Sequence, residues 1–410
     1  MQTQASDIRL SDPSFWQRPD RDDAFALLRR ERPVDWQEEP PTIWSDGGRG
    51  YWAVTRHEDV REASRRPDVF ASGHGTELFD LPADVARTYS GMLNMDAPEH
   101  TAMRAIVNAV FSPRRVATLA QDVQRSARAI IDDVSERGAC DFAVEVADAL
   151  PLAVICDLMG VPEADRRAIR RLSQSSHPLG DPEFGTFDDA YRAVGELIEY
   201  GKALLRERLE RPSDDLGADL AAAGIDEEDG GTFFELLITA GIDTTGAAIA
   251  HGLLALSEDE TQRTRWQADF DRLEVTAVEE ILRWSTPVVH FRRTATADTE
   301  LAGQPIAAGD KVVLFYNSAN RDETVFEAPG SFDIARRHNP HVTFGGGGPH
   351  FCLGAHLARL ELKTLFRELF ERLPDITVSG TPVLMHSMFF NGVKSLPCEF
   401  TPQHPTSADR

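Results

Sequence analysis

The stretch that decides the fold of this chain is "FGGGGPHFCLGAHLARLE", residues 344–361. Four consecutive glycines, Gly345 to Gly348, lead through a Pro-His-Phe tripeptide to Cys352, and a helical pattern begins directly after that cysteine. Glycine permits positive φ angles and close approach of the backbone to a flat ligand. The N–H groups and dipole at the start of the following helix favour the thiolate form of the cysteine. The stretch therefore predicts a thiolate held close to a flat ligand.

Other interpretations of this cysteine fit the residues less well. A lone cysteine is more often a small buried hydrophobic residue than a ligand. A zinc site would need further cysteines or histidines at ligand spacing, and none accompanies Cys352. A phosphate-binding loop would continue with Gly-Lys and Ser or Thr after the glycines. A single axial thiolate over one face of a planar macrocycle, as in cysteine-ligated haem, agrees better with the pattern.

Eight residues of this stretch match a known signature: Phe344, Gly345, Gly348, His350, Cys352, Gly354, Leu357 and Ala358. They resemble the haem-binding signature of the bacterial cytochrome P-450 family, the haem-thiolate monooxygenases. The resemblance implies haem b (iron protoporphyrin IX) as cofactor, with Cys352 as the metal ligand. It also implies that Phe344, Gly345 and Gly354 lie beside the ring. The spacing from Phe344 to Cys352 is one residue longer than the commonest pattern, and this form resembles the subgroup acting on sterols, methyl-branched lipids and terpenoids.

A second motif lies in an apolar helix that we expect over residues 232–257, where "AGIDTT" begins at Ala240. The motif could be a polar interruption of a buried helix, but an unpaired carboxylate at Asp243 would be costly there and suggests a function. The Thr244 hydroxyl can bond the Ala240 carbonyl, and Gly241 leaves room for a small molecule such as dioxygen. By resemblance, Asp243 and Thr244 are the catalytic pair that supplies protons during dioxygen reduction. Ala240 and Gly241 then border the cofactor.

Basic residues that could hold haem propionates form a third group. His100 and Arg104 stand four residues apart and share a helix face, which alone could be an ordinary solvated basic face. The family binds propionates with residues at these two positions and at those of Arg293 and His350, so the resemblance assigns all four to the cofactor. Arg292 cannot be separated from its neighbour by sequence.

The segment "AVEEILRWSTP" contains Glu280 and Arg283, three residues apart on a helix. Surface pairs with this spacing are common and contribute little to stability. The resemblance identifies them instead as the Glu-x-x-Arg structural pair, buried behind the haem. It extends from Met95 to about Phe400.

The chain as a whole is expected to be mainly α with minor β content (α+β), and the resemblance implies a P-450 fold with a long central helix over the haem. Helical spacing runs over about residues 101–205 and again over about 353–373. The polar residues 211–231 are expected to be a connection. Short strands are expected after Thr286.

The composition excludes several classes of partner. Lys and Arg total 43 and Asp and Glu total 67, so the formal net charge of −24 disfavours nucleic acid and anionic membranes. The four cysteines are scattered, which indicates reduced thiols in a cytoplasm. No signal-peptide pattern or membrane anchor is apparent. We expect one domain over residues 1–410, with a disordered tail at about 401–410.

The segments that resemble the family's substrate-contacting regions are apolar. The expected lining residues are Leu236, Val288, Val289, Phe291 and Phe390. Any one of them could instead fill the core, but together they predict a pocket that selects an apolar small molecule by shape and buried area. A terpenoid, steroid or methyl-branched lipid meets this description. His290 and His386 are candidates for holding a substrate hydroxyl or carbonyl.

Electrons must come from outside the chain, because it has no flavin-binding or iron–sulfur cysteine pattern. A separate ferredoxin and an NAD(P)H-dependent ferredoxin reductase are therefore implied, with dioxygen as co-substrate. The basic residues expected to attract the ferredoxin are Arg104, Arg114, Arg115, Arg359 and Lys363. Two other functions stay open: a haem-binding sensor or electron carrier without oxygen chemistry, and a peroxide-driven haem-thiolate enzyme. Asp243 and Thr244 argue against the first, and the second would need them less.

Overall fold

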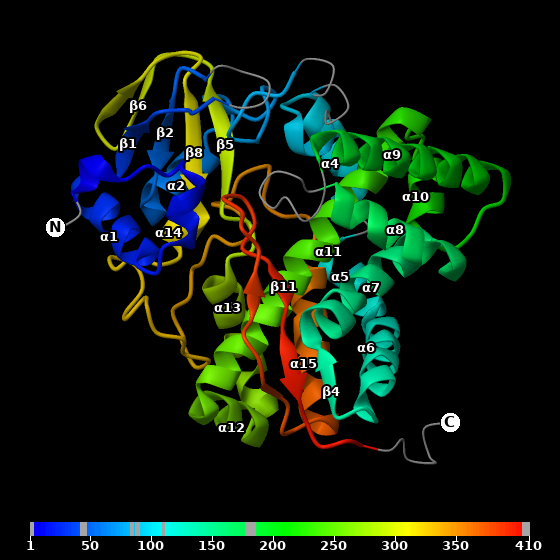
Figure 1. Cartoon of the computed structure of the whole chain (residues 1–410). Helices are drawn as coiled ribbons and strands as arrows, with labels where there is room; N and C mark the ends of the chain where they lie inside the picture. The colour runs from blue at the N-terminus through cyan, green and yellow to red at the C-terminus, as the bar shows by residue number, and fades with distance from the viewer. Residues whose placement is uncertain are drawn as a thin grey trace.

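The computed structural model describes residues 4–41, 47–82, 86, 91–108, 111–176 and 186–403 (Figure 1). Its α-helices are α1 (Arg21–Glu31), α2 (His57–Ser64), α4 (Glu99–Asn108), α5 (Pro113–Thr118), α6 (Ala120–Ser135), α7 (Ala149–Met159), α8 (Glu163–Ser175), α9 (Phe187–Glu210), α10 (Leu216–Ala222), α11 (Glu227–Glu258), α12 (Glu260–Ala268), α13 (Phe270–Ser285), α14 (Tyr316–Ala319) and α15 (Ala355–Arg372). Its strands are β1 (Val34–Gln37), β2 (Tyr51–Val54), β3 (Phe70–Ala71), β4 (Ala139–Asp141), β5 (His290–Ala295), β6 (Thr299–Leu301), β7 (Gln304–Ile306), β8 (Lys311–Phe315), β9 (Thr377–Val378), β10 (Val383–Leu384), β11 (Val393–Ser395) and β12 (Pro397–Glu399).

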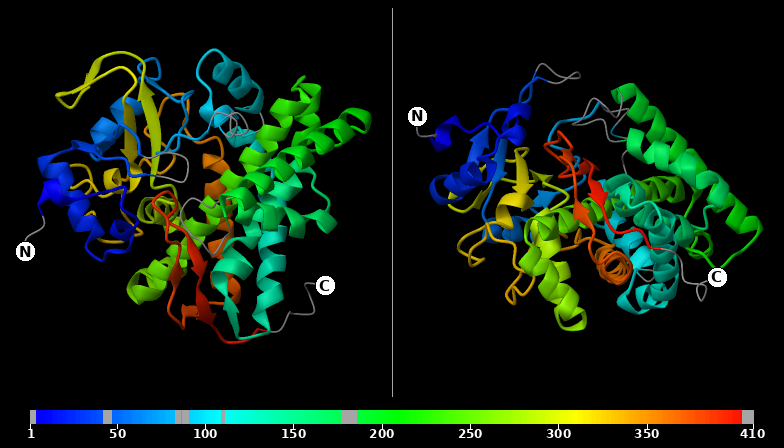
Figure 2. Two further views of the ribbon diagram at one scale, coloured as in Figure 1. Left: turned by 45° about the horizontal axis from the view of Figure 1, so that its top comes forward. Right: turned by 60° about the horizontal axis from the view of Figure 1, so that its bottom comes forward.

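A sheet-containing part and a larger helical part lie side by side (Figures 1 and 2). The main sheet has the strand order β1-β2-β8-β5-β3, and only the β2–β8 pair is parallel. Smaller pairings, such as β4-β12-β9, join the middle of the chain to its C-terminal end. The expected class, mainly α with minor β content, is confirmed.

Helix α11 is the central helix of the helical part and packs against α7, α9, α13 and α15. It begins at Glu227, five residues before the expected start, because Asp226 caps it by accepting a hydrogen bond from the backbone N–H of Asp229. Acidic residues in the first turn also suit the positive end of the helix dipole. In the described part of the chain, α11 is the one helix long and apolar enough to cross a membrane, but most of its apolar window is buried in the protein core.

The expected connection over residues 211–231 is only partly a connection. It contains α10, which Asp215 caps through the backbone N–H of Ala218 at 2.9 Å. Leu216 and Leu220, four residues apart, are buried in the main core, and α10 packs against α9. The apolar spacing was obscured by the many acidic and glycine residues around it, so this part of the expectation was wrong.

The last helix lies where the sequence predicts it, whereas the start of the predicted disordered tail is ordered. Helix α15 spans Ala355–Arg372, within two residues of the expected ends. The expected disordered tail is wrong for residues 401–403. The Thr401 backbone N–H donates to the Asp375 carboxylate, and the Gln403 N–H donates to the Ser135 carbonyl at 2.8 Å. Residues 404–410 lie outside the described residues.

Helix α13 carries Glu280 and Arg283, which form a completely buried ion pair. The guanidinium donates two hydrogen bonds to the carboxylate, at 2.7 and 2.8 Å. Arg336 and Asn339 donate further hydrogen bonds to the same carboxylate, so both of its oxygens have hydrogen-bond partners. The pair thereby holds the end of α13 against the loop that precedes the cysteine stretch.

Candidate active site

A cavity lies between α11 and the cysteine loop, and it is lined mainly by apolar side chains. Helix α11 supplies Leu236, Ala240 and Thr244, while Phe291 comes from β5. Cys352 lies at the opposite wall, on the loop before α15. Segments that are far apart in the sequence therefore meet around one space.

The glycine run has two structural roles. Gly345, Gly346 and Gly347 line the cavity, and Gly345, Gly347 and Gly348 have φ angles of +96°, +101° and +79°. A Cβ atom on Gly348 would lie 2.2 Å from the Ser64 carbonyl oxygen, at the end of α2. The backbone thus approaches the cavity as expected, but Gly346 and Gly348 also allow the loop to pack against α2, a contact that sequence reasoning missed.

Cys352 faces the cavity and is accessible from it, while protein surrounds the rest of the side chain. Burial raises the pKa of the thiol, and hydrogen bonds from the backbone N–H groups of Gly354 and Ala355 act in the opposite direction, as does the positive charge of Arg104. The helix start therefore points donors at the sulfur. A metal bound at this sulfur would complete the change to thiolate.

Four basic residues converge on the same cavity: His100, Arg104, Arg293 and His350. The rings of His100 and His350 lie 4.1 Å apart, centroid to centroid. Burial, followed by the charges of Arg293 and His100, lowers the pKa of His350 to about 3. In the described part of the chain, neither Arg104 nor Arg293 has an ion pair with an acid; they donate to the carbonyls of Phe351 and Arg292.

This donor set fits haem. Among the described residues, none of the four basic side chains forms an ion pair with an acid, although the charge of Asp96 acts on His100 and His350. The two propionates of haem would supply negative charge there. The single thiol of Cys352, across the cavity from α11, offers one axial ligand. Among the described residues, no group of His, Cys, Asp and Glu forms an alternative metal site.

The geometry of β5 determines which of Arg292 and Arg293 lines the cavity. Successive side chains of a strand point to opposite faces, so Arg293 shares a face with Phe291, and both line the cavity. Arg292 points the other way and donates to the His74 carbonyl at 2.8 Å and to the Asp80 carboxylate at 2.6 Å.

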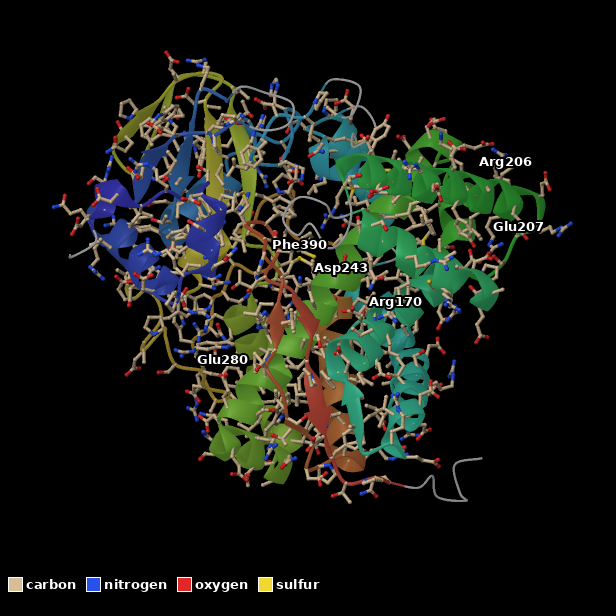
Figure 3. All side chains as sticks on the ribbon, in the orientation of Figure 1. Arg170, Arg206, Glu207, Asp243, Glu280 and Phe390 are labelled. Carbon is tan, nitrogen blue, oxygen red and sulfur yellow. The ribbon has the colours of Figure 1, made fainter. Side chains whose placement is uncertain are left out.

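The motif on α11 has the expected local geometry at Thr244, whose hydroxyl donates to the Ala240 carbonyl at 2.7 Å. Ala240, Gly241 and Thr244 line the cavity, whereas Asp243 is outside the lining. Figure 3 labels Asp243 on α11 and Arg170 on α8, two helices that contact each other.

Sequence reasoning missed Asp148, at the start of α7. Burial, and then the charge of Asp243, raises the pKa of Asp148 to about 7, so the two carboxyl groups interact. The Asp148 carboxylate also lies 3.9 Å from the Arg170 guanidinium. No local pattern marks this residue, because its partners come from α8 and α11.

Three of the five expected pocket residues line the cavity: Leu236, Val288 and Phe291. Val289 does not, since it is buried in a separate cluster with Phe15 and Phe315. Phe390 is also outside the lining, where its backbone forms a bridge to Val288. The spacing of Leu236 along α11 could also have indicated Phe233 and Leu237, which line the cavity from neighbouring positions.

The two histidines suggested as polar anchors are wrong for this structure. His290 is buried outside the cavity lining, with its ring 5.3 Å from that of Phe315. Burial lowers its pKa to about 4. His386 is exposed and does not line the cavity.

Acids of α13 pair with two of the five residues of the expected basic face. Arg359 donates to the Glu279 carboxylate at 2.5 and 2.9 Å, and its guanidinium lies 4.5 Å from the centre of the Phe344 ring. Lys363 pairs with Glu274 at 2.7 Å. Arg114 is exposed, and Arg115 lies 3.9 Å from the exposed carboxylate of Asp214. Two of the five basic residues expected to attract a ferredoxin are therefore paired with acids, and docking at this face stays a prediction.

Comparisons with known proteins agree with this geometry. Residues 196–384 match the family model described as Cytochrome P450. The "Methyl-branched lipid omega-hydroxylase" of Mycobacterium tuberculosis is 43% identical over 406 residues, covering 96% of this chain and 94% of that protein. The "Steroid C26-monooxygenase" of Rhodococcus jostii is 40% identical over 386 residues, covering 92% and 81%.

A solved structure gives the same result. A Mycobacterium marinum cytochrome P450 in complex with pseudoionone superposes with a TM-score of 0.92 at 40% identity, covering 98% of this chain and 100% of that one. The similarity thus spans nearly the whole length of the chain. The chain belongs to the cytochrome P450 family and is a monooxygenase with a haem cofactor.

Proposed function

We propose that this protein is a haem b monooxygenase that hydroxylates a terminal methyl group of an apolar, methyl-branched molecule. The observation that carries the proposal is the mainly apolar cavity between Thr244 and Cys352. The names of two relatives, an omega-hydroxylase of methyl-branched lipids and a steroid C26-monooxygenase, both refer to carbons at a chain end. A terpenoid, a steroid side chain and a branched fatty chain share that feature.

The residues of the chain divide into a cofactor set and a substrate set. Cys352 would be the axial ligand, and His100, Arg104, Arg293 and His350 would hold the propionates. When bound, the haem iron supplies the activation of dioxygen. Phe344 and Gly345 border the cavity beside the cysteine.

The substrate set acts through shape. Leu236, Val288 and Phe291 present apolar surface to the cavity, so they favour an apolar chain and exclude water. The absence of His290 and His386 from the lining removes the expected polar anchors. Recognition by buried apolar area, at about 25 cal/mol per Å², therefore favours substrates of about ten carbons or more.

We assign proton supply to Thr244 and Asp243 of α11, together with Asp148 at the start of α7. Thr244 offers a hydroxyl at the cavity wall, and Asp243 lies next to it in the chain with the partly protonated Asp148 behind. Since a carboxyl group with a pKa near 7 can both hold and release a proton at neutral pH, Asp148 is suited to reload Asp243. This arrangement supports dioxygen chemistry over a sensor or electron carrier.

The electron donor is proposed to be an external ferredoxin reduced by an NAD(P)H-dependent reductase. The neutralised cations Arg359 and Lys363 do not supply a strongly basic docking face. Arg114 is exposed on α5, a helix that contacts α15. Phe351, next to Cys352 in the chain, is 39% exposed. We therefore expect docking to depend on this exposed aromatic side chain as well as on charge.

The test is a reconstitution with haem, a surrogate ferredoxin and its reductase. Branched fatty acids, sterols and terpenoids should shift the Soret band and give products hydroxylated at a chain end. If small charged or aromatic acids shift the band and the apolar compounds do not, the substrate class is wrong. Turnover with hydrogen peroxide alone, at a rate equal to the ferredoxin-supported rate, would favour the peroxide-driven enzyme.

A further inference from the structure

His251 lies on α11 seven residues after Thr244, which is nearly two helical turns along the same face. Its Nε2 atom is 2.9 Å from the backbone carbonyl oxygen of Asn391. Burial lowers the pKa of the imidazole to about 4, and Arg21 and Arg321 act in the same direction. The ring is therefore neutral at physiological pH. Because a carbonyl only accepts, Nε2 carries the hydrogen and donates it to Asn391.

Asn391 is itself held at two further points. Its side-chain amide donates to the Ser285 carbonyl at 2.5 Å, at the end of α13. Its backbone N–H donates to the Pro287 carbonyl at 2.8 Å. One residue thus connects the central helix, the end of α13 and the segment that enters β5.

The same segment forms part of the cavity wall. Pro287 and Val288 line the cavity, and Val288 forms a backbone bridge with Phe390. The Val289 N–H donates to the Phe389 carbonyl at 2.8 Å, so the two segments are paired along several residues. Figures 1 and 2 show the C-terminal segment that leads to β11 running beside α11, and Figure 3 labels Phe390 in it.

We propose that His251 is a positioning residue for substrate specificity. By holding Asn391 to α11, it sets the distance between the helix face that carries Thr244 and the part of the cavity wall formed by Pro287 and Val288. That distance decides which carbon of an apolar chain reaches the oxidising centre, because an apolar pocket has few other means of fixing the depth of its ligand. The inference rests on the proposed function for the identity of the substrate, but the hydrogen-bond link does not.

The test compares two variants of the same position. His251→Leu removes the donor, whereas the side-chain amide of His251→Gln can still donate to the Asn391 carbonyl. With a branched-chain substrate, His251→Leu should change the ratio of terminal to in-chain hydroxylation by about fivefold, while His251→Gln should stay within about twofold of the wild type. Haem content and the carbon-monoxide spectrum, measured on both, exclude general misfolding. Equal product ratios in His251→Leu and the wild type would overturn the proposal.

A second measurement needs no substrate. Hydrogen–deuterium exchange of the amides of Asn391 and Val289 reports the pairing directly. Exchange of both should accelerate in His251→Leu and stay unchanged in His251→Gln, and unchanged exchange in both variants would overturn the proposal. If His251→Leu does not fold, His251→Met also removes the donor to the Asn391 carbonyl and should alter the product ratio in the same direction. If instead exchange responds as expected but no apolar compound is hydroxylated, the proposed function fails while the link from His251 to Asn391 stands.

Discussion

The Thr244 hydroxyl donates a hydrogen bond to the Ala240 carbonyl oxygen at 2.7 Å, and both residues line the cavity. A helix carbonyl that accepts from a side chain has a weakened bond within the helix, which makes the helix easier to open at this point. The relationship places a hydroxyl and an adaptable piece of backbone at the cavity wall, one residue after Asp243.

Thr244→Ala should separate electron consumption from product formation. We expect NAD(P)H oxidation to continue while the yield of hydroxylated product per NAD(P)H falls by about tenfold, because the hydroxyl that handles protons is lost. Thr239→Ala is the matched control, since Thr239 makes the same kind of bond to the Glu235 carbonyl at 3.0 Å but does not line the cavity. Normal coupling in Thr244→Ala would remove the threonine from the mechanism.

Cys352→Ser should abolish the red-shifted Soret band of the reduced carbon-monoxide complex, because a serine hydroxyl does not replace a thiolate ligand. Cys156→Ala provides the control, since this thiol is fully buried in the helical core and outside the cavity lining. The control should lose some stability and keep the band. Persistence of the band in Cys352→Ser would show that another residue binds the iron.

Gly348→Ala should prevent the cysteine loop from packing on α2. The φ angle of +79° disfavours any Cβ, and the added atom would lie 2.2 Å from the Ser64 carbonyl oxygen. We expect a loss of about 2–4 kcal/mol in the free energy of unfolding, together with lower haem content. Gly330 has open space around it, so Gly330→Ala should change the free energy of unfolding by less than about 0.5 kcal/mol. Its haem content should equal that of the wild type. Equal haem content and stability in the two variants would refute the packing argument.

Glu280→Gln should destabilise the protein by about 3–5 kcal/mol, because it leaves the buried guanidinium of Arg283 without its counter-charge. Denaturant unfolding measures this change. Glu62→Gln removes an acid of similar geometry, 2.6 Å from Arg66, but at the surface, and should cost less than about 1 kcal/mol. A similar small cost for both substitutions would mean that the buried pair contributes little.

Asp148 gives a pH-dependent prediction. Its pKa is raised from 3.8 to about 7 in the folded protein, so the folded state binds this proton more tightly than the unfolded state. Stability is therefore lost as the pH rises between these two values and stays low above about 7. Asp148→Asn should raise the melting temperature more at pH 8 than at pH 4. The two changes should differ by about 3 °C.

The control for this pH effect is Asp214→Asn, because the Asp214 side chain is fully exposed. It should change the melting temperature equally at both pH values. An Asp148→Asn variant whose effect is also the same at pH 4 and pH 8 would contradict the raised pKa.

What the sequence by itself determined about this protein is local. Three features depend on residues within a few positions of each other: the glycine run before Cys352, the Thr244–Ala240 bond and the Glu280–Arg283 pair. At such short separations the geometry of a helix or loop follows from the spacing of its residues. For the same reason the cofactor and the family could be inferred from short motifs, since each motif carries its own geometry.

The tertiary structure alone decided which side chains reach the cavity and which charges are free. The alternation of side chains along β5 separates Arg293 from Arg292. Val289, just before this strand, is kept out of the lining by its packing in a separate cluster with Phe15 and Phe315. Glu279 neutralises Arg359 from a helix 80 residues earlier in the chain, and Ser64 meets Gly348 from α2. Such contacts depend on how distant elements pack, and spacing along one segment carries no information about its neighbours in space.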